Sequence, residues 1–356
     1  MTRIVMLGLL VAVIAPTQPG VAQGTQGDFV ARNFRFASGE VLPELRLHYT
    51  VLGQPRRDGR GVVRNAVLIL HGTGGTGRAF LSPIFAGVLF GPGQLLDTTR
   101  YYVVLPDGIG HGGSSKPSDG LRAKFPRYAY DDMVTSQHLL LTEGLRINHL
   151  RLVMGTSMGC MHSWVWGYTY PEFADGLVPL ACAPGQIAGL NRIRRKMIID
   201  DIRLDPAWKG GDYSDQPAAG LTAALQQLYL MSAAPLVQLR QAPTREAADS
   251  VIVAWLAARL KAVDANDMLY QFEASRDYDP SPHLEQVTAP VLAINSADDL
   301  VNPPELGIVE RLMPRVPKGR FVLLSISPDT RGHGTHSVPA VWGGLLKEFL
   351  LDLPER

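Results

Sequence analysis

The chain has 356 residues, of which 46% are hydrophobic and 19% are charged, and its formal net charge is +1. The charged fraction lies below the roughly 25% of an ordinary domain, so the chain can bury a large core. The charges balance and form no basic block, which argues against a nucleic-acid-binding protein.

The first 22 residues have the features of a secretory signal peptide. Arg3 supplies a short positive region, the segment 4–15 is apolar apart from Gly8, and Ala22 has a small residue two positions before it. We therefore expect cleavage after Ala22 and a secreted or periplasmic protein. A retained membrane anchor is the competing interpretation, but the apolar segment is shorter than the ~20 residues that span a bilayer, and no later run suggests a membrane span. Removal of Arg3 lowers Lys+Arg from 34 to 33, which equals the 33 Asp+Glu, so the mature chain is formally neutral.

The hydrophobic pattern predicts a sheet with two kinds of strand. Residues 31–36 and 44–52 alternate apolar with polar side chains, which favours an antiparallel pair with one exposed face. Later apolar runs are short and continuous, as in parallel strands covered on both faces. These runs are 66–70, 102–105, 150–154, 177–180, 290–294 and 321–324, and helix-compatible stretches near 129–143, 158–170 and 340–351 separate several of them. The pattern predicts an α/β fold with a mostly parallel, doubly wound sheet.

One segment interrupts this alternation. Residues 185–285 contain helix-forming sequence, such as the stretch 245–263, in place of further strands. We therefore expect a core domain made of residues 23–184 and 286–356, with residues 185–285 inserted as a helical cap or lid.

The two cysteines, Cys160 and Cys182, are too few for a disulfide framework. A bridge between them is one interpretation. Two buried free thiols are favoured, because free cysteine behaves as a small core residue.

Residues 155–159 form the only G-x-S-x-G pattern, Gly-Thr-Ser-Met-Gly, between an apolar run and a helix-compatible stretch. A strand, a sharp turn and a helix form a nucleophile elbow, in which the glycines avoid collisions and the turn lifts the serine clear of the sheet. Ser157 is thus the expected nucleophile. The alternative is a tight turn whose serine merely caps the helix.

The loop after the run 66–70 is rich in small residues and could supply backbone N–H groups to the site. We expect the amides of Thr73 and Met158 to form an oxyanion hole. A phosphate-binding loop is excluded because no Gly-Lys-Ser/Thr follows. His111, in the next loop, is interpreted as structural or pocket-lining, since it precedes the serine in the chain.

A base and a carboxylate are expected downstream of the serine, at the ends of later strands. Asp298 and Asp299 follow one strand, and the Asp-x-x-Val-x-Pro spacing favours Asp298 as the triad acid. His333 and His336 follow the last strand, and the glycines beside His333 favour it as the base. A metal site on the two histidines is disfavoured because no third ligand has a recognisable spacing.

Several segments carry a family resemblance. The chain resembles the homoserine O-acetyltransferase family of α/β-hydrolases over most of residues 30–350. The segments that carry this resemblance are 125–141, 154–161, 191–195, 210–213 and 264–266.

The resemblance implies an α/β-hydrolase fold, an acylated Ser157 with Asp298 and His333 as partners, and a helical cap that covers the site and makes a homodimer contact. It also implies that Arg195 helps to hold an amino-acid acceptor. Arg195 could equally be a solvated member of the basic run 192–196. No cofactor and no metal are expected.

One departure from the family bears on function. The residue after the histidine is an aspartate that binds the acceptor's amino group in the transferases, whereas Gly334 stands here. Export would also separate the protein from acetyl-CoA. We therefore expect a serine hydrolase that cleaves a small-molecule carboxylic ester. An amide substrate is not excluded. The alternatives are an O-acyltransferase of the homoserine type and a non-catalytic binding protein on a hydrolase scaffold. The acyl and alcohol groups cannot be read from residues 185–285.

Overall fold

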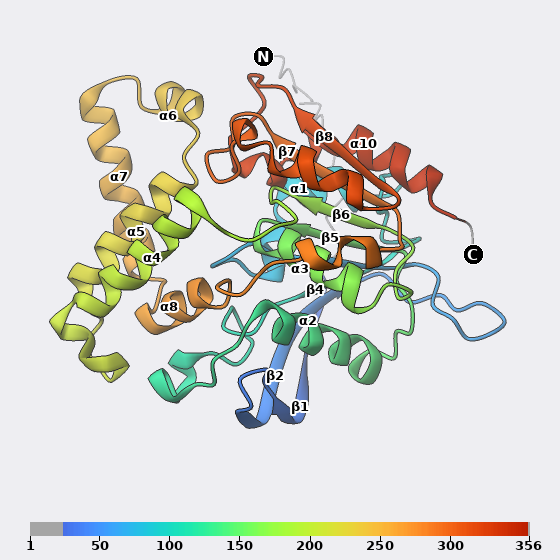
Figure 1. Cartoon of the computed structure of the whole chain (residues 1–356), viewed down its shortest axis with the longest axis horizontal. Coiled ribbons are helices and arrows are strands. Elements are labelled where there is room, and N and C mark those ends of the chain that lie inside the picture. The colour runs from blue at the N-terminus through green and yellow to red at the C-terminus, as the bar shows by residue number, and fades with distance from the viewer. Residues whose placement is uncertain (1–23, 355–356) are drawn as a thin grey trace, which may run out of the picture.

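The computed structural model describes residues 24–354, so the expected signal peptide at residues 1–22 lies outside the described residues. An eight-stranded sheet forms the centre of the molecule, with strand order β1-β2-β4-β3-β5-β6-β7-β8 (Figure 1). The strands are β1 Thr25–Arg35, β2 Val41–Leu52, β3 Ala66–Leu70, β4 Tyr102–Pro106, β5 Leu152–Thr156, β6 Leu177–Leu180, β7 Val291–Ser296 and β8 Gly319–Leu324.

The predicted antiparallel pair is present at the amino end. β1 pairs antiparallel with β2, and β2 pairs antiparallel with β4. In β2, Leu42, Leu45 and Leu47 are buried while most of the residues between them are exposed. The remaining neighbours pair in parallel, so the sheet is mostly parallel as predicted.

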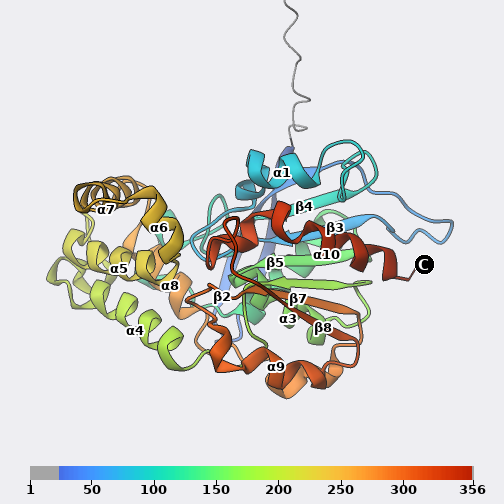
Figure 2. The ribbon, with the colours of Figure 1, turned by 90° about the horizontal axis from the view of Figure 1, so that it is seen from above.

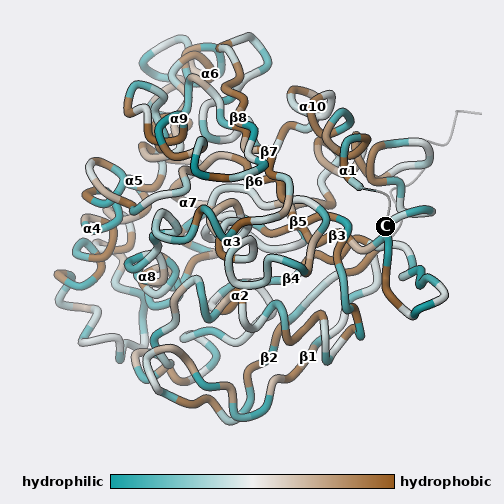
Figure 3. The backbone as a smooth tube through the Cα atoms, turned by 45° about the vertical axis from the view of Figure 1, so that its right-hand side comes forward, coloured by the Kyte–Doolittle hydropathy of each residue, from teal (hydrophilic) through white to brown (hydrophobic). Residues whose placement is uncertain are grey.

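Alternate residues of the central strands face two separate cores. Leu68 and Leu70 of β3 belong to a core that includes side chains of α2, α3 and α9. Val67 and Ile69 of the same strand belong to a core that includes α1 and α10. Because both faces are covered, hydrophobic stretches run along the strands near β3 and β5 and along α10 (Figure 3). The result is a three-layer α/β fold.

The last strand differs from the prediction. The run 321–324 is expected to be covered on both faces, but β8 has no fully buried residue. It is the edge strand and pairs only with β7 in the described sheet, so one side of it lacks a neighbouring strand.

Ten α-helices flank the sheet or extend beyond it in the described residues. Predicted helices near 129–143, 158–170 and 340–351 are present, the first continuing into a π-helical turn at Leu140–Gly144. The helices are α1 Pro83–Leu89, α2 Tyr130–Leu139, α3 Met158–Thr169, α4 Gly189–Leu204, α5 Ala218–Met231, α6 Pro235–Gln241, α7 Arg245–Leu260, α8 Ala265–Glu273, α9 Ile308–Leu312 and α10 Pro339–Asp352.

Helices α4 to α8 lie between β6 and β7 in the chain and stand together beside the sheet (Figure 2). They enclose a core of their own, with Ile198, Leu221 and Phe272 among its buried residues. No helix in residues 24–354 combines the length and the apolar character needed to cross a bilayer.

Candidate active site

Ser157 lies at the turn between β5 and α3, where the sequence predicts it. Its backbone has φ 54° and ψ −110°, a conformation that residues with a side chain rarely adopt. A Cβ atom on Gly155 would lie 1.9 Å from the carbonyl oxygen of Gly159, and one on Gly159 would lie 2.0 Å from that of Leu70. Only glycine fits at these two positions, so the turn can press against β3 and present the serine side chain at the sheet edge. The Ser157 side chain makes no capping hydrogen bond to α3, which removes the helix-cap alternative.

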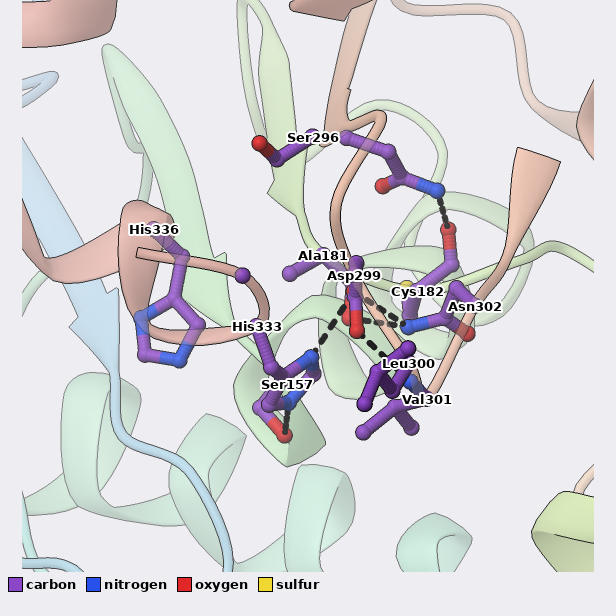
Figure 4. A network of polar contacts seen from close by, with 12 residues as sticks. Ser157, Ala181, Cys182, Ser296, Asp299, Leu300, Val301, Asn302, His333 and His336 are labelled. Carbon is purple, nitrogen blue, oxygen red and sulfur yellow. Dashed lines mark hydrogen bonds and ion pairs between the residues drawn. The ribbon is translucent and has the colours of Figure 1, made fainter. Parts of the chain in front are cut away.

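His333 faces this serine from the loop after β8. Its Nε2 atom lies 2.8 Å from Ser157 Oγ (Figure 4). His336 lies beside it, with ring centres 5.2 Å apart, but Nδ1 of His336 faces the Ser337 hydroxyl instead. The structure therefore brings together the serine and the histidine that the sequence favours.

The carboxylate partner of His333 is Asp299, so the prediction of Asp298 is wrong. Asp299 Oδ2 lies 2.8 Å from His333 Nδ1. The same carboxylate accepts hydrogen bonds from the Val301 amide at 2.7 Å and from the Asn302 side chain at 3.1 Å. Burial raises the pKa of the Asp299 carboxyl, but His333 and these hydrogen bonds outweigh the burial and hold that pKa below its ordinary value.

Asp298 supports the loop that carries His333. Its carboxylate accepts hydrogen bonds from the Ser296 hydroxyl and from the Gly332 amide, the latter at 2.9 Å. The two adjacent acids leave the end of β7 in different directions. The Asp-x-x-Val-x-Pro spacing therefore does not show which of the two acids faces His333.

The oxyanion hole expected from the backbone amides of Thr73 and Met158 stays a prediction. Neither the Thr73 nor the Met158 amide donates a hydrogen bond to another group among residues 24–354. Met158 is the first residue of α3, where backbone N–H groups lack partners inside the helix. A Cβ atom on Gly72 would lie 3.2 Å from Ser157 Cβ, so the small residue lets this loop approach the serine closely.

A cavity of about 330 Å³ lies next to Ser157 and His333. It is bounded on the core side by Thr73, Ser157 and His333, and on the helical side by residues of α4, α5, α7 and α8. Arg195 and Arg259 both line it. Arg259 and Trp255 of α7 also line the cavity, and the sequence did not predict this. An arginine in an amphipathic helix has the same pattern as an ordinary surface residue.

A family model described as the alpha/beta hydrolase fold matches residues 65–321. The match covers more than half of the chain. The chain belongs to the α/β-hydrolase family.

The curated relatives of this α/β-hydrolase include acyltransferases. A probable acyltransferase from Methanothermobacter thermautotrophicus is 30% identical over 296 residues, which cover 83% of this chain and 89% of that protein. Curated homoserine O-acetyltransferases align over about half of their own length. These relatives confirm the resemblance to the homoserine O-acetyltransferase family.

Solved structures agree on the fold. A homoserine O-acetyltransferase from Bacillus anthracis superposes with a TM-score of 0.81 at 22% identity, covering 94% of this chain and 99% of that one. An acetylester hydrolase from Corynebacterium glutamicum superposes with a TM-score of 0.80 at 21% identity, covering 92% and 96%. At such identities the likeness concerns the fold alone.

Arg195 of this α/β-hydrolase is not a solvated member of the basic run. Its side chain is buried and its guanidinium donates from Nε to Asn191 at 2.9 Å and from Nη1 to the Ser275 hydroxyl at 3.0 Å. The guanidinium carbon lies 5.6 Å from the centre of the Phe272 ring. Arg195 is therefore fixed in place at the cavity wall.

The two cysteines form a disulfide, so the prediction of two free thiols is wrong. Cys160 lies in the first turn of α3 and Cys182 follows β6, with Cα atoms 5.9 Å apart. Sequence spacing could not reveal this proximity. It arises because β5 and β6 are neighbours and α3 turns back from the end of β5. The bond ties the helix that begins at the elbow to the next strand end.

His111 lies away from the serine, in a buried group with His71 and His162. The rings of His71 and His111 are 5.0 Å apart, and Nδ1 of His111 lies 2.9 Å from the Ile109 carbonyl. Burial lowers the pKa of all three histidines. Within the described part of the chain, no three His, Cys, Asp or Glu side chains are arranged to hold a metal ion.

Proposed function

We propose that this α/β-hydrolase cleaves a carboxylic ester through an acyl-enzyme on Ser157. The observation that carries the proposal is the continuous hydrogen-bonded chain from Ser157 Oγ through His333 to Asp299, at a strained elbow. A serine oxygen 2.8 Å from an imidazole nitrogen can lose its proton to that nitrogen as it attacks a carbonyl.

The other groups have defined parts in this reaction. Asp299 holds His333 in the tautomer that leaves Nε2 free to accept the serine proton, and it stabilises the imidazolium that forms. The unpaired amides of Thr73 and Met158 would stabilise the oxyanion of the tetrahedral intermediate. His333 then returns the proton to the leaving alcohol, and water attacks the acyl-enzyme by the same steps in reverse.

The charge of the cavity supports water over an amino-alcohol as the acyl acceptor. No Asp or Glu is among the described residues that line the cavity, and Gly334 places no carboxylate beside His333. An ammonium group entering this cavity would lose its hydration and meet two arginines. Homoserine, which carries an ammonium group, is therefore a poor acceptor for this site.

A second candidate is an O-acyltransferase that passes the acyl group to an alcohol. The similarity to the probable acyltransferase across most of both chains favours it, and Arg195 could hold the carboxylate of an amino-acid acceptor. A non-catalytic binding protein is disfavoured, because decay of the activity would not preserve the geometry of three side chains.

Product analysis tests these functions. The purified protein should release free acid from a panel of short and long acyl esters. Ser157→Ala should lower kcat by about 10⁴ or more, while the exposed control Ser214→Ala should leave it unchanged. Retention of a tenth of the activity by Ser157→Ala would refute the serine mechanism, and efficient acyl transfer to an added alcohol would favour the second candidate.

We also propose that the protein is exported and cleaved after Ala22, on the basis of the charge and apolar pattern of residues 1–22. The intact mass of protein recovered from the periplasm or medium of an expressing cell tests this directly. A mature chain that begins at Gln23 supports export, whereas recovery of uncleaved protein only in the cytoplasm contradicts it.

A further inference from the structure

The cavity next to Ser157 has a strongly one-sided charge. Its described lining contains Arg195 and Arg259 but no Asp or Glu. The histidines do not change this sign. Burial lowers the pKa of His336 to about 3 and also lowers the pKa of His71, so these two rings are neutral near pH 7. Two guanidinium groups therefore supply the charge of the cavity.

Arg259 lacks the partners that an arginine usually has. Its Nε atom is fully buried and has no hydrogen-bond partner in residues 24–354. No carboxylate of the described chain lies within 4.0 Å of its guanidinium. A guanidinium without an acceptor is costly in a partly buried place, so a group that accepts from its accessible N–H groups would bind favourably.

Trp255, one turn earlier on α7, holds this arginine in a fixed orientation. The guanidinium carbon of Arg259 lies 5.5 Å from the centre of the Trp255 ring. Such an aromatic contact engages the face of the guanidinium and leaves the N–H groups at its edge available. That edge matches a carboxylate, which can accept two parallel hydrogen bonds.

Two acids of the helices that line the cavity pair with other cations. On α4, Asp200 pairs with Lys196, and Glu273 at the end of α8 pairs with Arg203. Arg195, the other cationic side chain in the cavity, also has no carboxylate within 4.0 Å in the described residues. The protein itself thus leaves both cavity arginines without a counter-charge.

We propose that Arg259 is a substrate-binding residue and that the ester cleaved at Ser157 carries a carboxylate, which pairs with the guanidinium edge of Arg259. Trp255 is the positioning residue for this arginine. The carboxylate assignment rests on the proposed ester hydrolysis, whereas anion binding at Arg259 stands independently of turnover.

Matched esters test the substrate class. In the acyl arm, mono(4-nitrophenyl) glutarate is compared with 4-nitrophenyl pentanoate, which has the same chain length and no carboxylate. In the alcohol arm, acetoxyacetate is compared with its neutral methyl ester. We expect kcat/KM for the anionic ester to exceed that for the neutral one by about tenfold or more in one arm. Equal values, or a preference for the neutral ester in both arms, would overturn the proposal.

Variants of Arg259 test the residue. Arg259→Gln should lower the anionic-to-neutral ratio of kcat/KM by about tenfold or more, chiefly through KM, and Arg259→Lys should fall between because it keeps the charge but loses the planar edge. Arg245→Gln removes the same charge from an exposed position on α7 and should leave the ratio unchanged. An unchanged ratio in Arg259→Gln, or an equal loss in Arg245→Gln, would show that Arg259 does not bind the anion.

A binding measurement separates this inference from the proposed activity. Titration calorimetry of glutarate into the Ser157→Ala protein should give a Kd at least tenfold lower than in the Ser157→Ala/Arg259→Gln protein, provided that both give the same thermal unfolding profile. If glutarate binds in this way but no ester is cleaved, the anion site stands and the hydrolase proposal fails. If esters are cleaved but glutarate binds neither protein, the hydrolase proposal stands and the anion site fails.

Discussion

Asp299 and His333 are joined by a hydrogen bond of 2.8 Å between Oδ2 and Nδ1, although they are 34 positions apart in the chain. The Asp299 side chain is completely buried, whereas Asp298 beside it bonds, within residues 24–354, to the Ser296 hydroxyl at the strand end and to the Gly332 amide in the histidine loop. The two neighbouring acids therefore both position His333, but through different hydrogen bonds. Asp299 contacts the imidazole, and Asp298 holds the backbone next to it.

Exchanging each acid for its amide should separate these two roles. Asp299→Asn should lower kcat by about 10⁴, because an amide can hold His333 in the tautomer that cannot accept the serine proton. Asp298→Asn keeps an oxygen that can accept from the Gly332 amide, so it should cost roughly tenfold or less. Steady-state ester hydrolysis by both variants checks this. The opposite order of effects would restore Asp298 as the triad acid.

The site could be predicted from the sequence only where a local pattern fixes the geometry. The elbow glycines flank Ser157 in the chain, and their need for close packing against Leu70 is a local constraint. His333 could be selected by the glycines beside it. The choice between Asp298 and Asp299 depends on one turn after β7, and the Cys160–Cys182 bond depends on how α3 returns over β6. Neither relation leaves a periodic signal in the sequence.

The fold could be predicted more fully because continuous apolar runs and alternating runs report burial directly. β3 to β7 are fully buried as those runs indicate. β8 is the exception. It is the last strand in the order of the described sheet, and its apolar run does not show that it lies at an edge. Arg259 escaped prediction because its role depends on which side of α7 faces the cavity.

A carboxylate at position 334 should move the enzyme toward acyl transfer. A Cβ atom on Gly334 would meet only the Arg331 Cβ, at 3.8 Å, so an aspartate fits there. With L-homoserine and an acyl ester, Gly334→Asp should raise the ratio of O-acylhomoserine to free acid about tenfold or more, since it offers the ammonium group a partner worth about 1 to 3 kcal/mol. Gly334→Asn has nearly the same shape without the charge and serves as the control. The ratio of the two products is measured by mass spectrometry. An equal ratio in both variants, or efficient O-acylhomoserine formation by the unaltered protein, would contradict this prediction.

The Cys160–Cys182 bond should contribute measurably to stability. It closes a loop with a sequence separation of 22, for which chain entropy gives about 3 kcal/mol. The Cys160→Ala/Cys182→Ala protein should therefore lose about 2 to 4 kcal/mol of unfolding free energy in urea. Alkylation of the unfolded protein without reductant should add no mass, and alkylation after reduction should add two groups. Two reactive thiols before reduction would contradict the bond.

His162 should make the protein less stable in acid. Burial, together with the neighbouring His71, lowers the pKa of His162 to about 3, whereas an unfolded histidine titrates near pH 6.5. Below about pH 6.5 the unfolded chain binds a proton that the folded chain refuses, so stability present above that pH is lost as the pH falls toward 3. The loss approaches about 1.4 kcal/mol per pH unit for this one group.

The variant His162→Gln isolates this effect from that of the other titrating groups, because glutamine has no proton to gain. Urea unfolding at pH 7.5, 6.0 and 5.0 should show the variant gaining stability relative to the unaltered protein as the pH falls, by about 1 to 2 kcal/mol between pH 6.0 and 5.0. His283→Gln, at a position near the surface, provides the matched control for the exchange of a histidine for glutamine. If the difference in unfolding free energy between His162→Gln and the unaltered protein stays constant with pH, His162 binds its proton equally well in the folded and unfolded chain, and this prediction is wrong.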